Sequence, residues 1–253
     1  MAAEPLHFNL HDTPGPGQAS PSSPVASAEL SPENGVVTEP PVPYSQQRLV
    51  LIRGLQHLAP IDPRRVDLLL SLSKVCTELN KGEEAWEASR EAFDLCMACA
   101  DWQGAARAGE ALFLTNEAGA LQGLAHAIWL AVTFPIAVKV THDILERLIN
   151  EAPHDDIAAV AAATAHYIAD LRGGDDEAGQ EGRDNAARIV ANVSWSHGGV
   201  KDQEAFDIWF RIHNLDDPDT FLPLLASSLD KMTGGDWWYD RDALRARIPE
   251  QQD

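Results

Sequence analysis

Cysteine and basic residues are both scarce in this 253-residue chain, and each scarcity excludes a class of protein. The three cysteines, Cys76, Cys96 and Cys99, are too few to build a disulfide scaffold. Lysine and arginine together number 19 against 39 acidic residues, which gives a formal net charge of −20. Because binding to a polyanion requires cations that replace its counterions, we expect no nucleic-acid partner. The same acidity repels anionic membrane surfaces.

Sequence signals for export, membrane insertion and catalysis are missing as well. The first residues have neither the basic nor the continuous apolar segment of a signal peptide, so we expect a cytoplasmic protein. Residues 118–138 carry no Asp, Glu, Lys or Arg and are long enough to span a bilayer. However, Gln122, His126 and Pro135 interrupt this segment, and we interpret it as a buried helix. Phosphate-binding, dinucleotide-binding and nucleophile-elbow motifs do not occur, so we expect no enzymatic activity and no cofactor.

Helical periodicity is what the sequence does contain. No run of alternating β-branched residues predicts a strand, so the fold class is all-α, with antiparallel helical hairpins arranged as an α-solenoid or an irregular bundle. Residues 1–43 hold nine of the 16 prolines and predict a disordered tail. Residues 44–231 form the predicted helical domain, and residues 232–253 a loop with aromatic side chains and a short helix.

Turn and cap signals place the predicted helices along the domain. Asp62 is the expected N-cap of one helix, with Pro63 in its first turn. The acidic, glycine-containing segment 173–184 reads as a surface loop or a frayed helix start. The expected helices lie near residues 44–59, 62–80, 83–98, 101–116, 118–134, 140–152, 155–172, 184–194, 203–213 and 219–231.

Two windows of the sequence share one pattern of turn and helix. In "NKGEEAWEASREAFDL", residues 80–95, a glycine ends one helix, and Ala85 and Ala92 recur seven apart on the next. The second window is "ADWQGAARAGEAL", residues 100–112. The residues in matching places of that window are Asp101, Trp102, Ala105 and Ala108.

These windows resemble the middle of a tetratricopeptide repeat, and the resemblance covers about residues 60–120. It implies a stacked array of antiparallel helices in which small residues lie where neighbouring helices come close. Two features depart from the family. The windows are about 20 residues apart instead of 34. The positions of the family's Trp, Leu-Gly and Tyr are filled here by Leu69, Leu72, Ser73 and Cys76.

The Cys96-x-x-Cys99 pair is the strongest candidate for chemistry. Residues at i and i+3 share a helix face, as two metal-ligating thiolates require. A closed zinc or iron–sulfur site needs four ligands, and Cys76 is the sole further thiol. Asp94 and Asp101 flank the pair near a helix C-terminus, which should raise the thiol pKa instead of lowering it as redox chemistry requires. We therefore favour small buried residues over a metal site at Cys76, Cys96 and Cys99.

Histidine and aromatic side chains provide the remaining candidates. A bundle metal site uses Glu-x-x-His pairs on inward faces, but Pro153 interrupts the pair formed by Glu151 and His154. The histidines at 126, 142, 154 and 166 are therefore expected to be hydrogen-bonded or exposed. Trp237, Trp238 and Tyr239 are candidates for partner binding, because aromatic residues are frequent binding hot spots. A clasp that packs these three rings on the helical body explains them equally well.

Two hypotheses of function follow from these observations. The first is a non-catalytic interaction, adaptor or assembly protein that presents a helical groove to another protein. The alternative is a metal- or thiol-redox-linked protein that uses Cys96 and Cys99. The first is favoured, with a protein as partner and neither nucleic acid nor membrane. The identity of the partner and the oligomeric state stay open.

Overall fold

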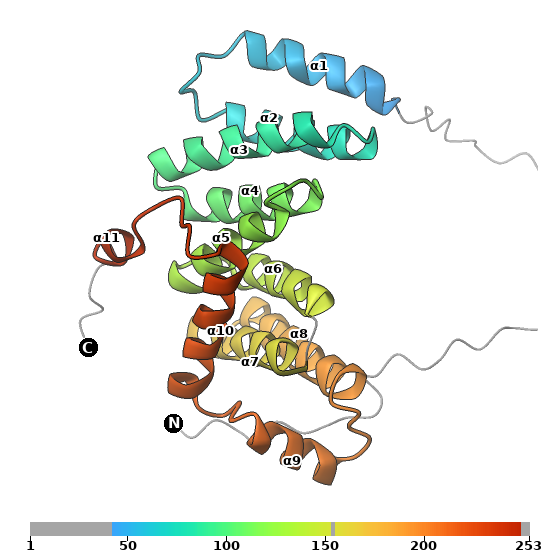
Figure 1. Cartoon of the computed structure of the whole chain (residues 1–253), viewed down its shortest axis with the longest axis vertical. Helices are drawn as coiled ribbons and strands as arrows, with labels where there is room; N and C mark the ends of the chain where they lie inside the picture. Colours follow the sequence, from blue (N-terminus) through green and yellow to red (C-terminus); the bar gives the residue numbers. More distant parts are fainter. Residues whose placement is uncertain (1–41, 153–154, 249–253) are drawn as a thin grey trace, which may run out of the picture.

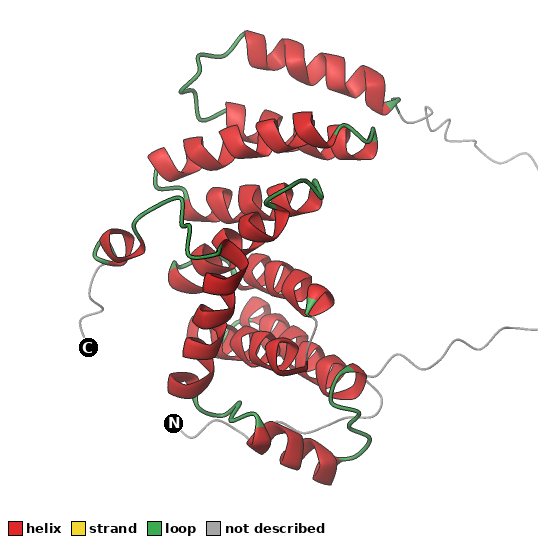
Figure 2. Cartoon of the chain, viewed as in Figure 1, coloured by secondary structure: helices red, strands yellow, loops and turns green. Residues whose placement is uncertain are grey.

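The computed structural model describes residues 42–152 and 155–248, and these residues form eleven α-helices without a strand (Figures 1 and 2). The prediction of an all-α fold is confirmed. The predicted disordered tail, residues 1–43, lies almost wholly outside the described residues. The helices are α1 (Tyr44–Gln56), α2 (Arg65–Glu78), α3 (Gly82–Ala98), α4 (Trp102–Leu114), α5 (Ala120–Thr133), α6 (Val138–Glu151), α7 (Asp155–Arg172), α8 (Glu177–Ser196), α9 (Gln203–Ile212), α10 (Pro218–Thr233) and α11 (Arg241–Arg245).

The first eight helices form a stacked array in which each helix packs against the next (Figure 1). Helices α2, α4, α6 and α8 also contact one another in sequence, so the even-numbered helices form one row of the array. Helix α10 packs on α5 and α7, which belong to the other row. The chain therefore builds a helical array and then returns across its odd-numbered row.

Identical turns join α2 to α3 and α3 to α4. Asn80 and Ala100 adopt the left-handed conformation, with φ of 55° and 56°. In each turn the following residue donates its backbone N–H to the carbonyl of a cysteine five residues earlier, Lys81 to Cys76 and Asp101 to Cys96, both at 2.9 Å. This pattern is the Schellman C-cap, which satisfies carbonyls at a helix end. The two similar windows are thus successive helix-to-helix turns, which explains their spacing of one helix instead of one hairpin.

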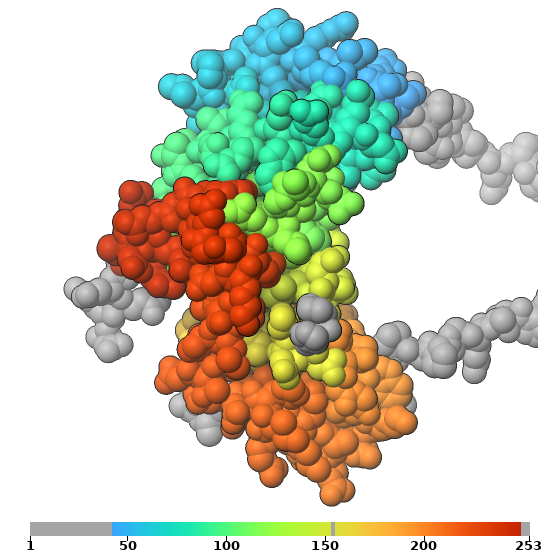
Figure 3. Space-filling view, in the orientation of Figure 1, coloured from blue at the N-terminus to red at the C-terminus, as the bar shows by residue number. Residues whose placement is uncertain are grey.

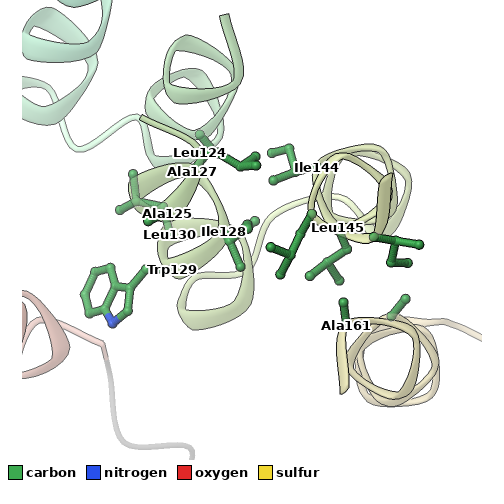
Figure 4. Packing of buried hydrophobic residues seen from close by; sticks show 14 of the residues in the cluster. Leu124, Ala125, Ala127, Ile128, Trp129, Leu130, Ile144, Leu145 and Ala161 are labelled. Atoms are coloured by element: carbon green, nitrogen blue, oxygen red, sulfur yellow. The ribbon is translucent and has the colours of Figure 1, made fainter. Parts of the chain in front are cut away.

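Small residues lie where neighbouring helices come closest, as the repeat resemblance implies. Ala85, Ala92 and Ala105 are all fully buried. Where α4 crosses α5, a Cβ on Gly109 would lie 2.9 Å from the carbonyl oxygen of Gly123. No side chain fits between the two backbones there. Larger apolar side chains fill the space around this crossing, with Ile144 and Leu145 of α6 on one side of α5 and Trp129 on the other (Figure 4).

Helix boundaries differ from the sequence prediction at two places. Helix α2 begins at Arg65, three residues after the expected cap; the carboxylate of Asp62 instead accepts the backbone N–H of Arg64 at 3.0 Å, in a turn that precedes the helix. Helix α8 begins at Glu177, so the segment predicted as a surface loop or a frayed helix start is largely helical. Its cap is Asp176, which accepts the N–H of Gly179 at 2.9 Å. That acidic side chain satisfies an orphan donor of the first turn.

Two acidic residues begin α7. Asp155 and Asp156 both lie in the first turn of the helix. Negative charge there is favourable because the N-terminus of a helix carries partial positive charge. The residue before them, His154, lies outside the described residues.

Arg172 at the end of α7 connects this helix to the C-terminal end of α5. Its guanidinium donates to the carbonyls of Ala131 at 2.8 Å and Val132 at 2.7 Å, near the C-terminal end of α5. A third hydrogen bond, at 3.2 Å, reaches the carbonyl of Ile136 in the following turn. A cation at a helix C-terminus also interacts favourably with the helix dipole. This side chain therefore satisfies the carbonyls that α5 leaves unpaired.

Replacing Ala85 or Ala92 by leucine should lower the free energy of unfolding by roughly 1–3 kcal/mol, because the added carbons enter a filled helix interface. Urea unfolding measures this change. Glu87→Leu is the control on the same helix, where the side chain is exposed and the effect should stay within about 0.5 kcal/mol. Unfolding of the two alanine variants at the wild-type midpoint would contradict the stacked arrangement.

Ala100→Gly should raise the stability by about 1 kcal/mol, because the left-handed conformation costs an alanine roughly that much and a glycine almost nothing. Thermal unfolding measures the shift. Ala98→Gly, two residues earlier and still helical, is the matched control and should destabilise the chain. Loss of stability in both variants would show that residue 100 does not adopt the left-handed turn.

Candidate functional site

The structure separates the three cysteines. Cys76 and Cys96 are buried in α2 and α3, whereas Cys99 is exposed beyond the last helical residue of α3. Cys99 is the C-cap residue of α3, and the chain turns directly after it. The expectation that both are small buried residues holds for Cys96 and fails for Cys99.

The surroundings of Cys96 oppose thiolate formation. Burial, and then the charge of Asp101, raise the pKa of the Cys96 thiol to about 12. Burial likewise raises the pKa of Cys76. Among the described residues, no group of three or more His, Cys, Asp or Glu side chains is placed to hold a metal ion. The raised pKa values of Cys76 and Cys96 disfavour the thiolate form that metal binding and thiol redox chemistry require.

Trp237, Trp238 and Tyr239 pack on the helical body instead of projecting from it. All three rings are half-buried against the core, and the C-terminal residues lie along the side of the array (Figure 3). The Trp238 ring contacts Phe93 of α3 edge-on, with ring centroids 5.2 Å apart. Tyr239 reaches Trp129 of α5 at 5.3 Å. This geometry is the clasp arrangement, and a role in partner binding stays a prediction.

His126 of α5 lies at the centre of this aromatic cluster. Its side chain is fully buried, and the Trp238 ring stacks on it with centroids 3.9 Å apart. Neither ring nitrogen has a hydrogen-bond partner among the described residues, which contradicts the expectation of hydrogen-bonded or exposed histidines. Burial, followed by the charges of Arg90 and Arg241, lowers the pKa of His126 to about 3. The imidazole is therefore neutral near pH 7.

The other described candidates follow the expected pattern more closely. His142 is buried, and its Nε2 lies 3.0 Å from the carbonyl oxygen of Ala165 while its Nδ1 lies 2.9 Å from the amide nitrogen of Asn185. This geometry assigns the proton to Nε2, which donates to the carbonyl. His166 faces Asp170 at 3.5 Å. Burial lowers the pKa of both histidines.

A polar cavity of about 740 Å³ opens between α6, α8 and the loop that joins α7 to α8. Glycines shape this loop; a Cβ on Gly179 would collide with the carbonyl of Gly174. The cavity belongs to the even-numbered row, which the C-terminal helices leave uncovered where α6 contacts α8. Its charged lining residues are Lys139, Asp143, Glu146, Arg172, Asp176, Glu181, Asp184 and Arg188.

Negative charge dominates the accessible part of this cavity. Lys139 pairs with Asp143 at 3.2 Å, and Arg172 is committed to backbone carbonyls. Glu146 and Glu181 are exposed, and neither forms an ion pair with another described residue. Five carboxylates and three cationic side chains line the cavity, so its net negative charge suits a cationic group.

No match to this chain was found among family models, curated proteins or solved structures. None of the helices in the described ranges is long and apolar enough to cross a membrane, so the charge-free segment 118–138 is a buried helix followed by a turn.

The sequence analysis identified Trp237, Trp238 and Tyr239 as candidates, but it did not predict that Trp238 stacks on His126. A lone histidine inside a 21-residue stretch without Asp, Glu, Lys or Arg was the available signal for a buried, unpaired His126. The cavity between α6 and α8 gave a weaker signal, the recurrence of glycine in residues 173–182. Neither signal specifies which surfaces the folded chain brings together.

Stability should fall as the pH drops below about 6.5, because the pKa of His126 is about 3 in the fold and near 6.5 in the unfolded chain. Between these values the unfolded chain binds more protons, so this contribution is complete above pH 6.5 and is lost progressively toward pH 3, at up to ~1.4 kcal/mol per pH unit. Urea unfolding from pH 7 to pH 5 measures the slope.

His126→Leu removes the titrating group at similar volume and should flatten that slope by up to ~1.4 kcal/mol per unit. His57→Phe is the control, because the His57 ring is exposed in the fold. An unchanged slope in His126→Leu would show that the ring is not buried in neutral form.

Proposed function

We propose that this protein is a non-catalytic interaction or assembly protein, and that its even-numbered row of helices presents a binding groove to a basic segment of another protein. The observation that carries this proposal is the acidic cavity between α6 and α8. Exposed carboxylates at Glu146 and Glu181 border it without cationic partners among the described residues. An arginine or lysine side chain supplies the complementary charge.

The arrangement of the chain supports the same proposal. The C-terminal helices cover the odd-numbered row, with α10 on α5 and α7, and leave the row of α2, α4, α6 and α8 free of that cover. A stacked helical array presents an extended surface whose residues come from several helices. The formal net charge of −20 speeds the encounter with a basic partner through long-range attraction.

Affinity capture from the source cells with a charge-reversed groove tests this proposal. Glu146→Lys combined with Glu181→Lys should lose, by roughly tenfold or more, a protein that the wild-type chain retains at low salt. Glu204→Lys with Asp216→Lys makes the same charge change at exposed positions outside the cavity and should retain that protein. The interaction should weaken as salt screens it. Identical captured proteins for all three chains would contradict a groove between α6 and α8.

A further inference from the structure

The surface of α3 and α5 beneath the C-terminal residues is an aromatic pocket, defined here by Trp86, Phe93, His126 and Trp129. Trp237, Trp238 and Tyr239 occupy it as a short extended segment. The ring centroid of Trp238 lies 3.9 Å from that of His126 and 5.2 Å from that of Phe93. Arg90 of α3 also contacts the Trp238 ring, with its guanidinium carbon 3.9 Å from the ring centroid. The pocket thus binds an aromatic side chain by stacking and a cation–π contact.

The present occupant leaves the polar atoms of the pocket unsatisfied. Both ring nitrogens of His126 and the indole nitrogen of Trp129 are buried without a hydrogen-bond partner in the part of the chain that the structure describes. Buried polar groups are normally paired, because desolvation without a partner is costly. The hydroxyl of Tyr239 reaches only the backbone carbonyl of His126, at 3.5 Å. An occupant with a suitably placed donor or acceptor would therefore bind this pocket better than the chain's own segment.

Two glycines connect the segment to α10. Gly234 and Gly235 have φ of 62° and 79°, and a Cβ at either residue would meet nothing within 4 Å. Beyond them, the polar contacts that hold the segment are few. Gln122 donates to the carbonyl of Asp236 at 2.6 Å. Asp230 of α10 accepts the Trp237 indole N–H at 2.9 Å and pairs with Arg241 at 3.0 Å. Most of the attachment is therefore ring packing.

We propose that this aromatic pocket is a docking site for a segment of another protein that carries three adjacent aromatic residues, and that residues 236–248 occupy it as an internal ligand until such a segment displaces them. The site lies on the odd-numbered row and goes beyond the groove proposed above, from which it is physically separate. The ligand class follows from the occupant that the fold already shows, three adjacent aromatic residues between Asp236 and Asp240.

The internal ligand sets the affinity that a partner must overcome. A tethered segment acts at an effective concentration in the millimolar range when its linker is short. An external segment then binds weakly to the wild-type chain and much more tightly once the internal ligand is weakened. An external segment gains affinity over the internal one if it forms hydrogen bonds to the ring nitrogens of His126 or the indole nitrogen of Trp129, because the internal segment forms none.

Fluorescence anisotropy with a labelled synthetic peptide of residues 234–248 tests the proposal on full-length protein. The chain with Trp237→Ala and Trp238→Ala should bind this peptide at least roughly tenfold more tightly than the wild-type chain does, because the internal competitor is weakened. The same peptide with both tryptophans replaced by alanine is the control and should not bind. Adding Phe93→Ala to the double variant should reverse the gain, because it removes part of the pocket.

Several results would overturn the proposal. Failure of the peptide to bind a folded double variant, with folding checked by circular dichroism, would show that the pocket accepts its segment only as part of the fold. Dimers of the wild-type chain that the peptide dissociates would identify the occupant as a second copy. The Glu146→Lys, Glu181→Lys variant should bind the peptide as the wild type does, so failure of the acidic groove and failure of this pocket give different results.

Hydrogen exchange of the wild-type chain decides the matter if the double variant does not fold. The amides of Leu244 and Ala246 are hydrogen-bonded within and just after α11 in the seated segment. If the segment leaves its pocket while the array stays folded, these amides should exchange at least roughly tenfold faster than those in the centre of α5, such as Ile128. Equal protection at both places would show that the segment separates only on global unfolding, and would overturn the proposal.

Discussion

The close approach of helix backbones at small residues is the constraint on which the rest of this structure depends. Gly109 and Gly123 bring α4 and α5 so close that no side chain fits between them. Fully buried alanines perform the same function along α3 and α4. Because these positions contribute little side-chain area, the large apolar residues of α5 are left to point outward to other partners. Trp129 is one of these, and it lies on the opposite side of α5 from Ile144 (Figure 4).

The C-terminal residues pack against this outward-facing aromatic surface. Helix α10 returns across α5 and α7, and the residues after it reach as far as α3 (Figures 1 and 3). The two rows consequently differ: α10 covers α5 and α7 of the odd-numbered row, whereas a cavity with more acidic than basic residues opens between α6 and α8 of the even-numbered row. The proposed groove and the proposed aromatic docking site each use one of these rows. A single chain can therefore present two surfaces of opposite chemical character.

The sequence was sufficient to predict elements and local packing, because these depend on neighbours along the chain. Periodicity placed most helices, and the spacing of Ala85 and Ala92 identified buried positions correctly. The start of α8 was missed, since it depends on a cap at Asp176 together with a close contact between Gly174 and Gly179.

The candidate sites were harder to predict, because they join residues distant in sequence. Trp238 contacts Phe93 and His126 only after the array has formed and the chain has returned across it.

A double-mutant cycle between Phe93 and Trp238, each replaced by leucine, tests most directly whether the C-terminal residues return to α3. The account predicts a favourable coupling of about 0.5–1.5 kcal/mol in the free energy of unfolding, the range for packed aromatic pairs. Additive effects, with no coupling, would contradict it.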